Sequence, residues 1–114
     1  MRGDLEDRLQ ELAALKKGWF DGEGESIPPS GIEQARAWLE HLLAEAPGLT
    51  GGPYLYPTVT GGVRVEFDIT DPEGDGVEVE FEPGGISYFG PNGESEGVSA
   101  DRALELVLKI IRGG

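Results

Sequence analysis

Hydrophobic residues recur at helical spacing in the first part of the chain. In residues 4–17, leucines stand three or four positions apart with charged residues between them, which predicts an amphipathic helix that ends at Gly18. A second helix is expected to begin at Ser30, because Ser30 and Glu33 have the spacing of a reciprocal capping box. Its hydrophobic side is formed by Ile32, Ala35, Leu39, Leu42, Leu43 and Ala46. The segment between the two helices is rich in glycine and proline and is predicted to be a loop.

After residue 53 the spacing of hydrophobic residues changes to two. Residues 63–69 and 77–82 alternate strictly between hydrophobic and polar, which predicts two antiparallel strands with one buried and one exposed face. Residues 54–60 are expected to form a further strand at an edge of the sheet, because the prolines there cannot donate ladder hydrogen bonds. A short strand is expected at residues 86–89, and the glycine-rich residues 90–98 are predicted to be a loop.

Helical spacing returns at the end of the chain, where Ser99 is predicted to cap a last helix. This order of elements predicts a single α+β domain over residues 1–114, with two N-terminal helices, an antiparallel meander of three or four strands, and a C-terminal helix packed on the sheet. The helices are expected to cover the sheet face formed by Val63, Val65, Phe67, Ile69, Val77, Val79 and Phe81.

Charge and composition narrow the range of functions. The 114 residues include 9 Lys or Arg and 22 Asp or Glu, which gives a net charge of −13, so direct binding of nucleic acid is not expected. The absence of cysteine and the single histidine leave almost no metal or redox chemistry, so no cofactor and no metal site is expected. The chain has no apolar run long enough for a membrane span and no secretory signal, and we expect a cytoplasmic protein without a membrane partner.

The negative charge is concentrated on the predicted sheet. If the Val and Phe residues of the strands point inward, five carboxylates point outward beside a single Arg64. They are Glu66, Asp68, Glu78, Glu80 and Glu82. Two interpretations remain open: a solvated surface that prevents aggregation, and a docking surface for a basic protein.

Other candidate sites are weaker. Asp71, Glu73 and Asp75 have the spacing of a calcium loop, but the second half of that segment alternates as a strand, so a hairpin turn with at most weak divalent-ion binding is expected. His41 lies on the second predicted helix, off its hydrophobic side, and the serines that a catalytic site would need lie in loops, at helix caps or in a short strand. No catalytic residue is therefore predicted, although a hydrolase that uses a pair of carboxylates is a third alternative.

The loop between the first two helices has an unusual sequence. Closely spaced glycines and carboxylates surround Trp19, Phe20 and Asp21. The glycine spacing resembles that of a phosphate-binding loop, but the carboxylates would repel a phosphate group. Either the loop places Trp19 and Phe20 in the core, or one of these rings is exposed as an anchor at a protein interface.

Gly18-Trp19-Phe20-Asp21-Gly22-Glu23-Gly24, with the later Tyr56-Pro57-Thr58 and Gly61-Gly62 before a strand, resembles a group of small uncharacterised bacterial and phage proteins. Those proteins carry a Gly-Trp-Asp-Gly-like motif after the first helix, whereas this chain has Phe20 between Trp and Asp. The resemblance covers residues 5 to about 82. It implies an accessory or inhibitory role and no catalytic residue.

The sequence therefore predicts a non-enzymatic acidic binding module that docks on the basic surface of another protein. An antitoxin, an immunity protein or a phage-encoded inhibitor of a nucleic-acid enzyme would act in this way, and one form of such docking is mimicry of nucleic acid. The predicted contact residues are Glu66, Asp68, Glu78, Glu80, Glu82, Trp19, Phe20 and Asp21. The alternative is a small structural or assembly subunit that uses apolar contacts through Trp19, Phe20 or the last helix.

Overall fold

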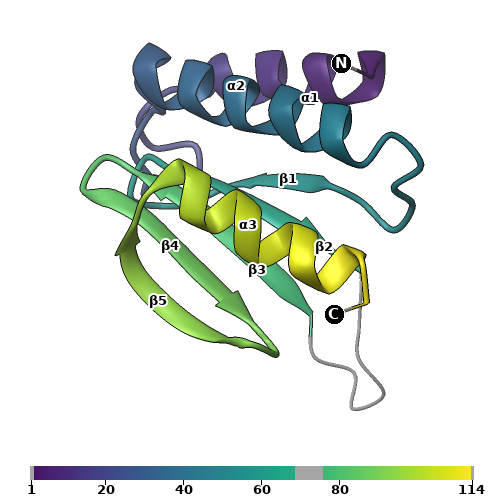
Figure 1. The fold of residues 1–114 in the computed structure, drawn as a ribbon. Helices are drawn as coiled ribbons and strands as arrows, with labels where there is room; N and C mark the ends of the chain where they lie inside the picture. The colour runs from purple at the N-terminus through teal and green to yellow at the C-terminus, as the bar shows by residue number, and fades with distance from the viewer. Residues whose placement is uncertain (1, 69–75, 114) are drawn as a thin grey trace.

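The computed structural model describes residues 2–68 and 76–113. Two helices, α1 (Gly3–Ala13) and α2 (Pro29–Glu45), precede five strands, and a third helix follows them. The strands are β1 (Tyr54–Pro57), β2 (Val63–Phe67), β3 (Val77–Glu82), β4 (Gly85–Gly90) and β5 (Gly93–Val98), and the last helix is α3 (Ala100–Ile111). The strands pair in chain order in one antiparallel sheet, and the helices lie along one side of it (Figure 1).

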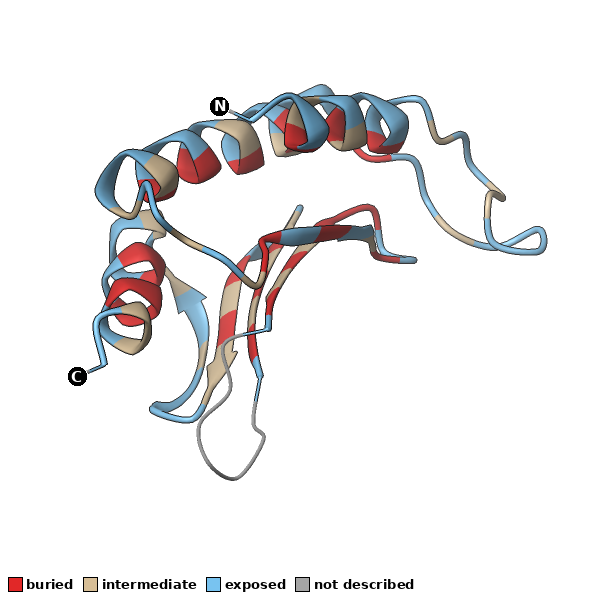
Figure 2. Ribbon diagram, turned by 90° about the vertical axis from the view of Figure 1, so that its right-hand side faces the viewer, coloured by how far each residue is buried: buried red, intermediate tan, exposed pale blue. Residues whose placement is uncertain are grey.

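Strand alternation sets the two faces of the sheet, as the sequence predicts. The hydrophobic residues of β2 and β3 are buried beneath the helices, and the polar residues between them are partly exposed. In Figure 2 the buried positions of the helices and the sheet turn toward each other. β1 lies at one edge of the sheet, which confirms the position predicted from its prolines. The strand ends at Pro57, however, and residues 58–62 form a turn in which the Thr58 amide donates to the Gly62 carbonyl at 3.0 Å.

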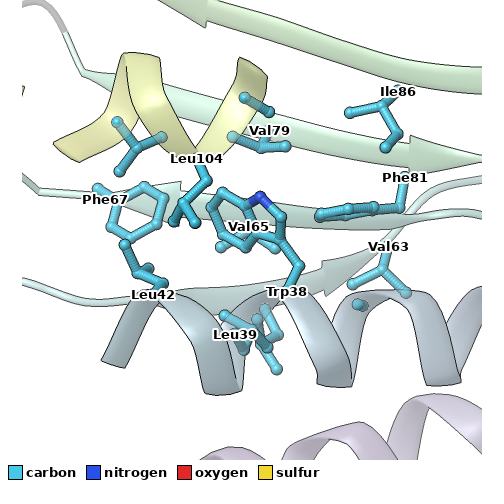
Figure 3. Packing of buried hydrophobic residues seen from close by; sticks show 14 of the residues in the cluster. Trp38, Leu39, Leu42, Val63, Val65, Phe67, Val79, Phe81, Ile86 and Leu104 are labelled. Carbon is cyan, nitrogen blue, oxygen red and sulfur yellow. The ribbon is translucent and has the colours of Figure 1, made fainter. Parts of the chain in front are cut away.

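Trp38 lies at the centre of the core, although the hydrophobic series read from the sequence omits it. Its indole packs edge-on against Phe81 and Phe67, with ring centroids 5.5 and 6.3 Å away (Figure 3). The indole nitrogen also donates to the Ala100 carbonyl at 3.1 Å. One side chain of α2 therefore contacts the sheet and the first residue of α3.

Two helix ends differ from the prediction. α1 ends at Ala13, not at Gly18. Leu12 is the last fully buried leucine of this helix, so the residues after it have no buried side to continue the helix. α2 begins at Pro29 without a side-chain cap, so the predicted capping box of Ser30 and Glu33 is wrong. Proline in the first turn lacks an N–H, which leaves fewer donors for a cap, and Glu33 instead forms an ion pair with Arg36.

The predicted loop at residues 90–98 is also wrong, because residues 93–98 form β5. A two-residue turn joins Gly90 to Gly93, and Phe89 then pairs with Glu94 and Ser87 with Glu96. Gly97, at φ +67°, accompanies a register shift near Ile86, so the glycines that suggested a loop serve a turn and a bulge. Ile69, Asp71, Glu73 and Asp75 lie outside the described residues.

Ser99 caps α3 as predicted, since its hydroxyl accepts a hydrogen bond from the Arg102 amide at 3.0 Å. Within the ranges 2–68 and 76–113, no helix combines the length and hydrophobicity that a bilayer crossing requires.

Candidate protein-binding face

The sheet surface that faces away from the helices, here called the open face, carries two rows of paired side chains. One row runs through Tyr54, Glu66, Glu78, Phe89 and Glu94, each residue paired with the next on the neighbouring strand. The second row runs through Tyr56, Arg64, Glu80, Ser87 and Glu96 in the same way. Glu82 follows Glu80 on the outward side of β3, and Asp68 is exposed just beyond the end of β2.

Over residues 2–68 and 76–113, one cation contacts this group of carboxylates. Arg64 is the only Arg or Lys between residues 49 and 99. Its Nε lies 3.0 Å from a Glu80 carboxylate oxygen and 4.0 Å from one of Glu78. Burial raises the pKa of Glu78, Arg64 opposes the rise, and the facing Glu66 carboxylate adds to it. Negative charge on the open face is therefore only partly compensated.

Exposed hydrophobic side chains gather beside the carboxylates. The large hydrophobic residues with the most exposure in the described chain are Phe20 at 54%, Val59 at 49%, Tyr54 at 46% and Tyr56 at 41%. The two tyrosines stand on the open face itself, while Phe20 and Val59 border it from the α1–α2 loop and the turn after β1. Charged and aromatic groups thus share one surface.

The loop that carries Phe20 is a small hairpin. Phe20 and Glu23 exchange two backbone hydrogen bonds of 2.8 Å around Asp21 and Gly22. Both turn residues have positive φ, at +49° and +88°, as a type I′ turn requires. The Glu25 amide donates to the Val59 carbonyl at 3.0 Å and so attaches the loop to the turn after β1.

Trp19 stabilises this hairpin from within. Its indole nitrogen donates to the Glu25 carbonyl at 2.9 Å, and its ring crosses Gly24 so closely that a Cβ there would lie 2.7 Å from the indole nitrogen. The Trp19 and Phe20 rings are 5.8 Å apart and tilted. Neither ring joins the core cluster, so of the two alternatives raised by the sequence, burial in the core is wrong for Phe20.

Two hollows adjoin each other on the open face and share Tyr56 and Glu66. The first, of about 500 Å³, is bordered by the rings of Trp19, Phe20 and Tyr56, here called the aromatic wall, and by the carboxylates of Glu66, Glu80 and Glu82, here called the acidic wall. Arg64 also borders this hollow, where it is paired with Glu80. The second, of about 470 Å³, is bordered by Tyr54, Tyr56, Glu66, Asp68 and Glu78.

Glu82 is held in place at the first hollow. Its carboxylate accepts a hydrogen bond from the Thr60 hydroxyl at 2.7 Å, and the Thr60 and Thr58 hydroxyl oxygens lie 3.2 Å apart. The Gly62 amide in turn donates to the Thr58 hydroxyl at 2.8 Å. A Cβ on Gly62 would lie 2.5 Å from the Glu82 carboxyl carbon, so glycine leaves the room into which this carboxylate folds.

The structure brings together seven of the eight predicted contact residues. Trp19, Phe20, Glu66, Glu80 and Glu82 border the first hollow, and Asp68 and Glu78 border the second. Asp21 is exposed at the tip of the hairpin and borders neither.

Sequence reasoning missed Tyr54, Tyr56, Glu94 and Glu96. Each pair stands two positions apart, as the outward residues of a strand do, and this spacing could have identified them. Glycines on either side of Glu94 and Glu96 concealed the strand.

His41, the other candidate, is exposed on α2 beside a groove that α3 borders with Leu104 and Leu108. In the part of the chain that the structure describes, no three His, Cys, Asp or Glu side chains are grouped to hold a metal ion.

Comparison with models of protein families, with curated proteins and with solved structures finds no match for this chain. The resemblance to small bacterial and phage proteins therefore stays a prediction that rests on the motifs alone.

Proposed function

We propose that this protein is a non-enzymatic binding module whose open face docks on a basic surface of another protein. Antitoxins, immunity proteins and inhibitors of nucleic-acid enzymes act in this way. The proposal rests on one observation: the most exposed large hydrophobic side chains and a partly neutralised group of carboxylates occupy the same surface.

A purely solvated surface explains the carboxylates but not the aromatic side chains. Like charges on adjacent strands destabilise a sheet by up to about 1 kcal/mol per close pair, and water and salt relieve part of this. The apolar surface of an aromatic ring is unfavourable in water, yet the hairpin of residues 18–24 is hydrogen-bonded with the Phe20 ring exposed. Aromatic residues beside charged ones are typical of protein interfaces, where the rings supply binding energy and the charges supply specificity.

The alternative is an assembly subunit that uses apolar contacts. The hydrophobic residues of α3 are largely buried in the fold, including Leu104, Val107 and Leu108, so this helix offers little apolar surface. Phe20 and the two tyrosines are available for such contacts, but the carboxylates around them would oppose self-association through this face.

The test is capture of partners from host lysate by the tagged protein and two variants of equal net charge. Glu78→Lys, Glu80→Lys and Glu82→Lys together reverse the open face. Asp7→Lys, Glu40→Lys and Asp101→Lys reverse three exposed carboxylates on the helices and serve as the control. Circular dichroism establishes that both variants are folded.

We expect the native protein and the helix variant to retain the same basic protein at low salt and the open-face variant to lose it. Retention should fall as the NaCl concentration rises from about 0.05 to about 0.3 M, because screening weakens an electrostatic interface. Equal retention by both variants would refute docking through the open face. A homo-oligomer that survives high salt would favour the assembly subunit instead.

A further inference from the structure

We propose that the first hollow receives an arginine side chain of the partner, with the face of its guanidinium on the aromatic wall and the guanidinium N–H groups directed to the acidic wall. This inference rests on the proposed function and specifies the chemistry of the partner at one position. It follows from the lining of the hollow, from the fixed position of Glu82 and from the behaviour of Arg64.

The two walls match the flat face and the N–H edge of a guanidinium. Phe20 and Tyr56 offer exposed rings over which a planar guanidinium can stack, and Val59 extends the apolar surface. Glu80 and Glu82 on β3 and Glu66 on β2 provide carboxylate oxygens, and Arg64, which also borders the hollow, is bound to Glu80. A guanidinium suits this combination better than an ammonium, because it is planar, less strongly hydrated and able to bind a carboxylate with two N–H groups.

Glu82 is oriented before any partner arrives. The Thr60 hydroxyl donates to one carboxylate oxygen, Oε2, and Gly62 leaves space for the carboxyl group. Among the described residues, no Lys or Arg nitrogen lies within 4.0 Å of the Glu82 carboxylate. A carboxylate that is already fixed loses little side-chain freedom on binding a cation, which favours association.

Arg64 provides an internal example of a guanidinium bound to a carboxylate of β3. Arg64 on β2 is paired with Tyr56 on β1 and with Glu80 on β3. Its Nε donates a hydrogen bond to the Glu80 carboxylate at 3.0 Å. Arg64 therefore neutralises Glu80, whereas Glu82 has no Lys or Arg partner among the described residues. An arginine from the partner would repeat at Glu82, two residues further along β3, the contact that Arg64 forms with Glu80.

The test is a nuclear magnetic resonance titration of the ¹⁵N-labelled full chain with three probes. They are the N-acetyl methylamides of arginine, lysine and citrulline; citrulline has nearly the shape of arginine but no charge. The indole N–H of Trp19 reports on the hollow, because its ring forms part of the aromatic wall. The indole N–H of Trp38, which donates to Ala100 in the core, is the internal control.

Arginine should shift the Trp19 indole signal and the amide signals of Phe20, Thr60 and Glu82 in a saturable manner, and leave the Trp38 signal in place. Lysine should bind about three- to fivefold more weakly, the ratio that stacking on an exposed ring supports. Citrulline should cause no saturable shift. Equal binding of lysine and arginine, or shifts spread evenly over all acidic residues, would overturn the proposal.

Two pairs of variants locate the site. Glu82→Gln retains an acceptor for Thr60 but loses its charge, and it should weaken arginine binding about two- to fivefold, whereas Glu94→Gln, on the same face but away from the hollow, should not. Phe20→Leu should weaken binding and Tyr54→Leu, at the second hollow, should not. The Trp38 signal verifies folding in each case. Equal effects within either pair would refute this position for the arginine.

The two proposals can fail separately. If the captured protein still requires the open face but arginine and lysine bind alike, docking stands and the arginine contact is wrong. If arginine binds selectively but the open-face variant loses no protein, the docking proposal is wrong.

Discussion

Gly24 determines whether the indole of Trp19 can lie across the hairpin. Gly24 and Gly22 have similar positive φ values of +95° and +88°, but only at Gly24 would a Cβ meet the Trp19 ring. Gly22→Ala should lower the free energy of unfolding by about 1 kcal/mol through backbone strain alone. Gly24→Ala should lower it further and break the hydrogen bond from Trp19 to Glu25.

Urea denaturation measures the two stabilities, and the Trp19 indole N–H signal reports on the ring. We expect a large shift of that signal in Gly24→Ala and a small one in Gly22→Ala. Identical spectra for the two variants would contradict the close packing of Trp19 on Gly24.

Glu78 gives the open face a dependence on pH. Burial raises its pKa above the ordinary 4.5, so between pH 4.5 and the raised value the folded chain holds more protons than the unfolded chain. The contribution of this carboxyl to stability therefore decreases as pH rises through that interval. Glu78→Gln should be more stable than the native protein at pH 7, by a few tenths of a kcal/mol to about 1, and the difference should shrink as pH falls toward 4.5.

Urea midpoints measured at several pH values test this expectation. Glu94→Gln is the control, because Glu94 stands opposite Phe89 and not opposite a second carboxylate. A difference between Glu78→Gln and the native protein that stays constant with pH would contradict the assignment to the raised pKa.

The burial of two aromatic residues, Trp38 and Phe20, shows what the sequence can and cannot predict. Trp38 stands three positions after Ala35 and four before Leu42, so helical spacing permits its burial, but spacing alone does not reveal that its indole reaches both the sheet and α3. Phe20 is the opposite case: its hydrophobicity suggests burial, but it stands in a hydrogen-bonded hairpin and is exposed.

At the level of whole elements, the two serines predicted to cap helices differ in function. The Ser99 hydroxyl accepts a hydrogen bond from the Arg102 amide, whereas α2 has no side-chain cap at all. Ser99→Ala should therefore lower the free energy of unfolding by about 1 kcal/mol, while Ser30→Ala should change it by less than about 0.5 kcal/mol. Urea denaturation followed by circular dichroism compares the two, and an equal loss would contradict the observed caps.

The strands were predictable where alternation was strict and hidden where glycine interrupted it. β2 and β3 alternate without a break and appear as predicted, with buried Val and Phe on one side. β5 has glycine at both ends of its short acidic segment, and composition there resembles a loop. The carboxylates of β3 could therefore be predicted from the sequence. The carboxylates of β5 became apparent only from the pairing of β5 with β4 in the structure.

For the molecule as a whole, the carboxylate that Arg64 neutralises and the contact between the hairpin and the turn after β1 could not be predicted from the chain. Charge counting locates the excess of carboxylates on the sheet, but it does not say which of them a single arginine neutralises. The loop between α1 and α2 meets the turn after β1 only in the folded chain, through the bond from Glu25 to Val59. The first hollow is a product of that contact.

The same charge distribution predicts opposite effects of salt on folding and on binding. Raising the salt concentration from about 0.01 to about 0.15 M shortens the screening length from about 30 to about 8 Å. Screening weakens the repulsion within a chain of net charge −13, so the urea midpoint of the free protein should rise. It also weakens attraction to a basic partner, so affinity should fall over the same range.

Chemical denaturation and binding measurements in matched NaCl solutions test this pair of expectations. The variant with Lys at positions 78, 80 and 82 should show a flatter response of stability to salt, because it reduces the net negative charge by six units. If affinity rose with salt together with stability, apolar contacts through Phe20 and the tyrosines would dominate the interface, and the carboxylates of the open face would serve solubility alone.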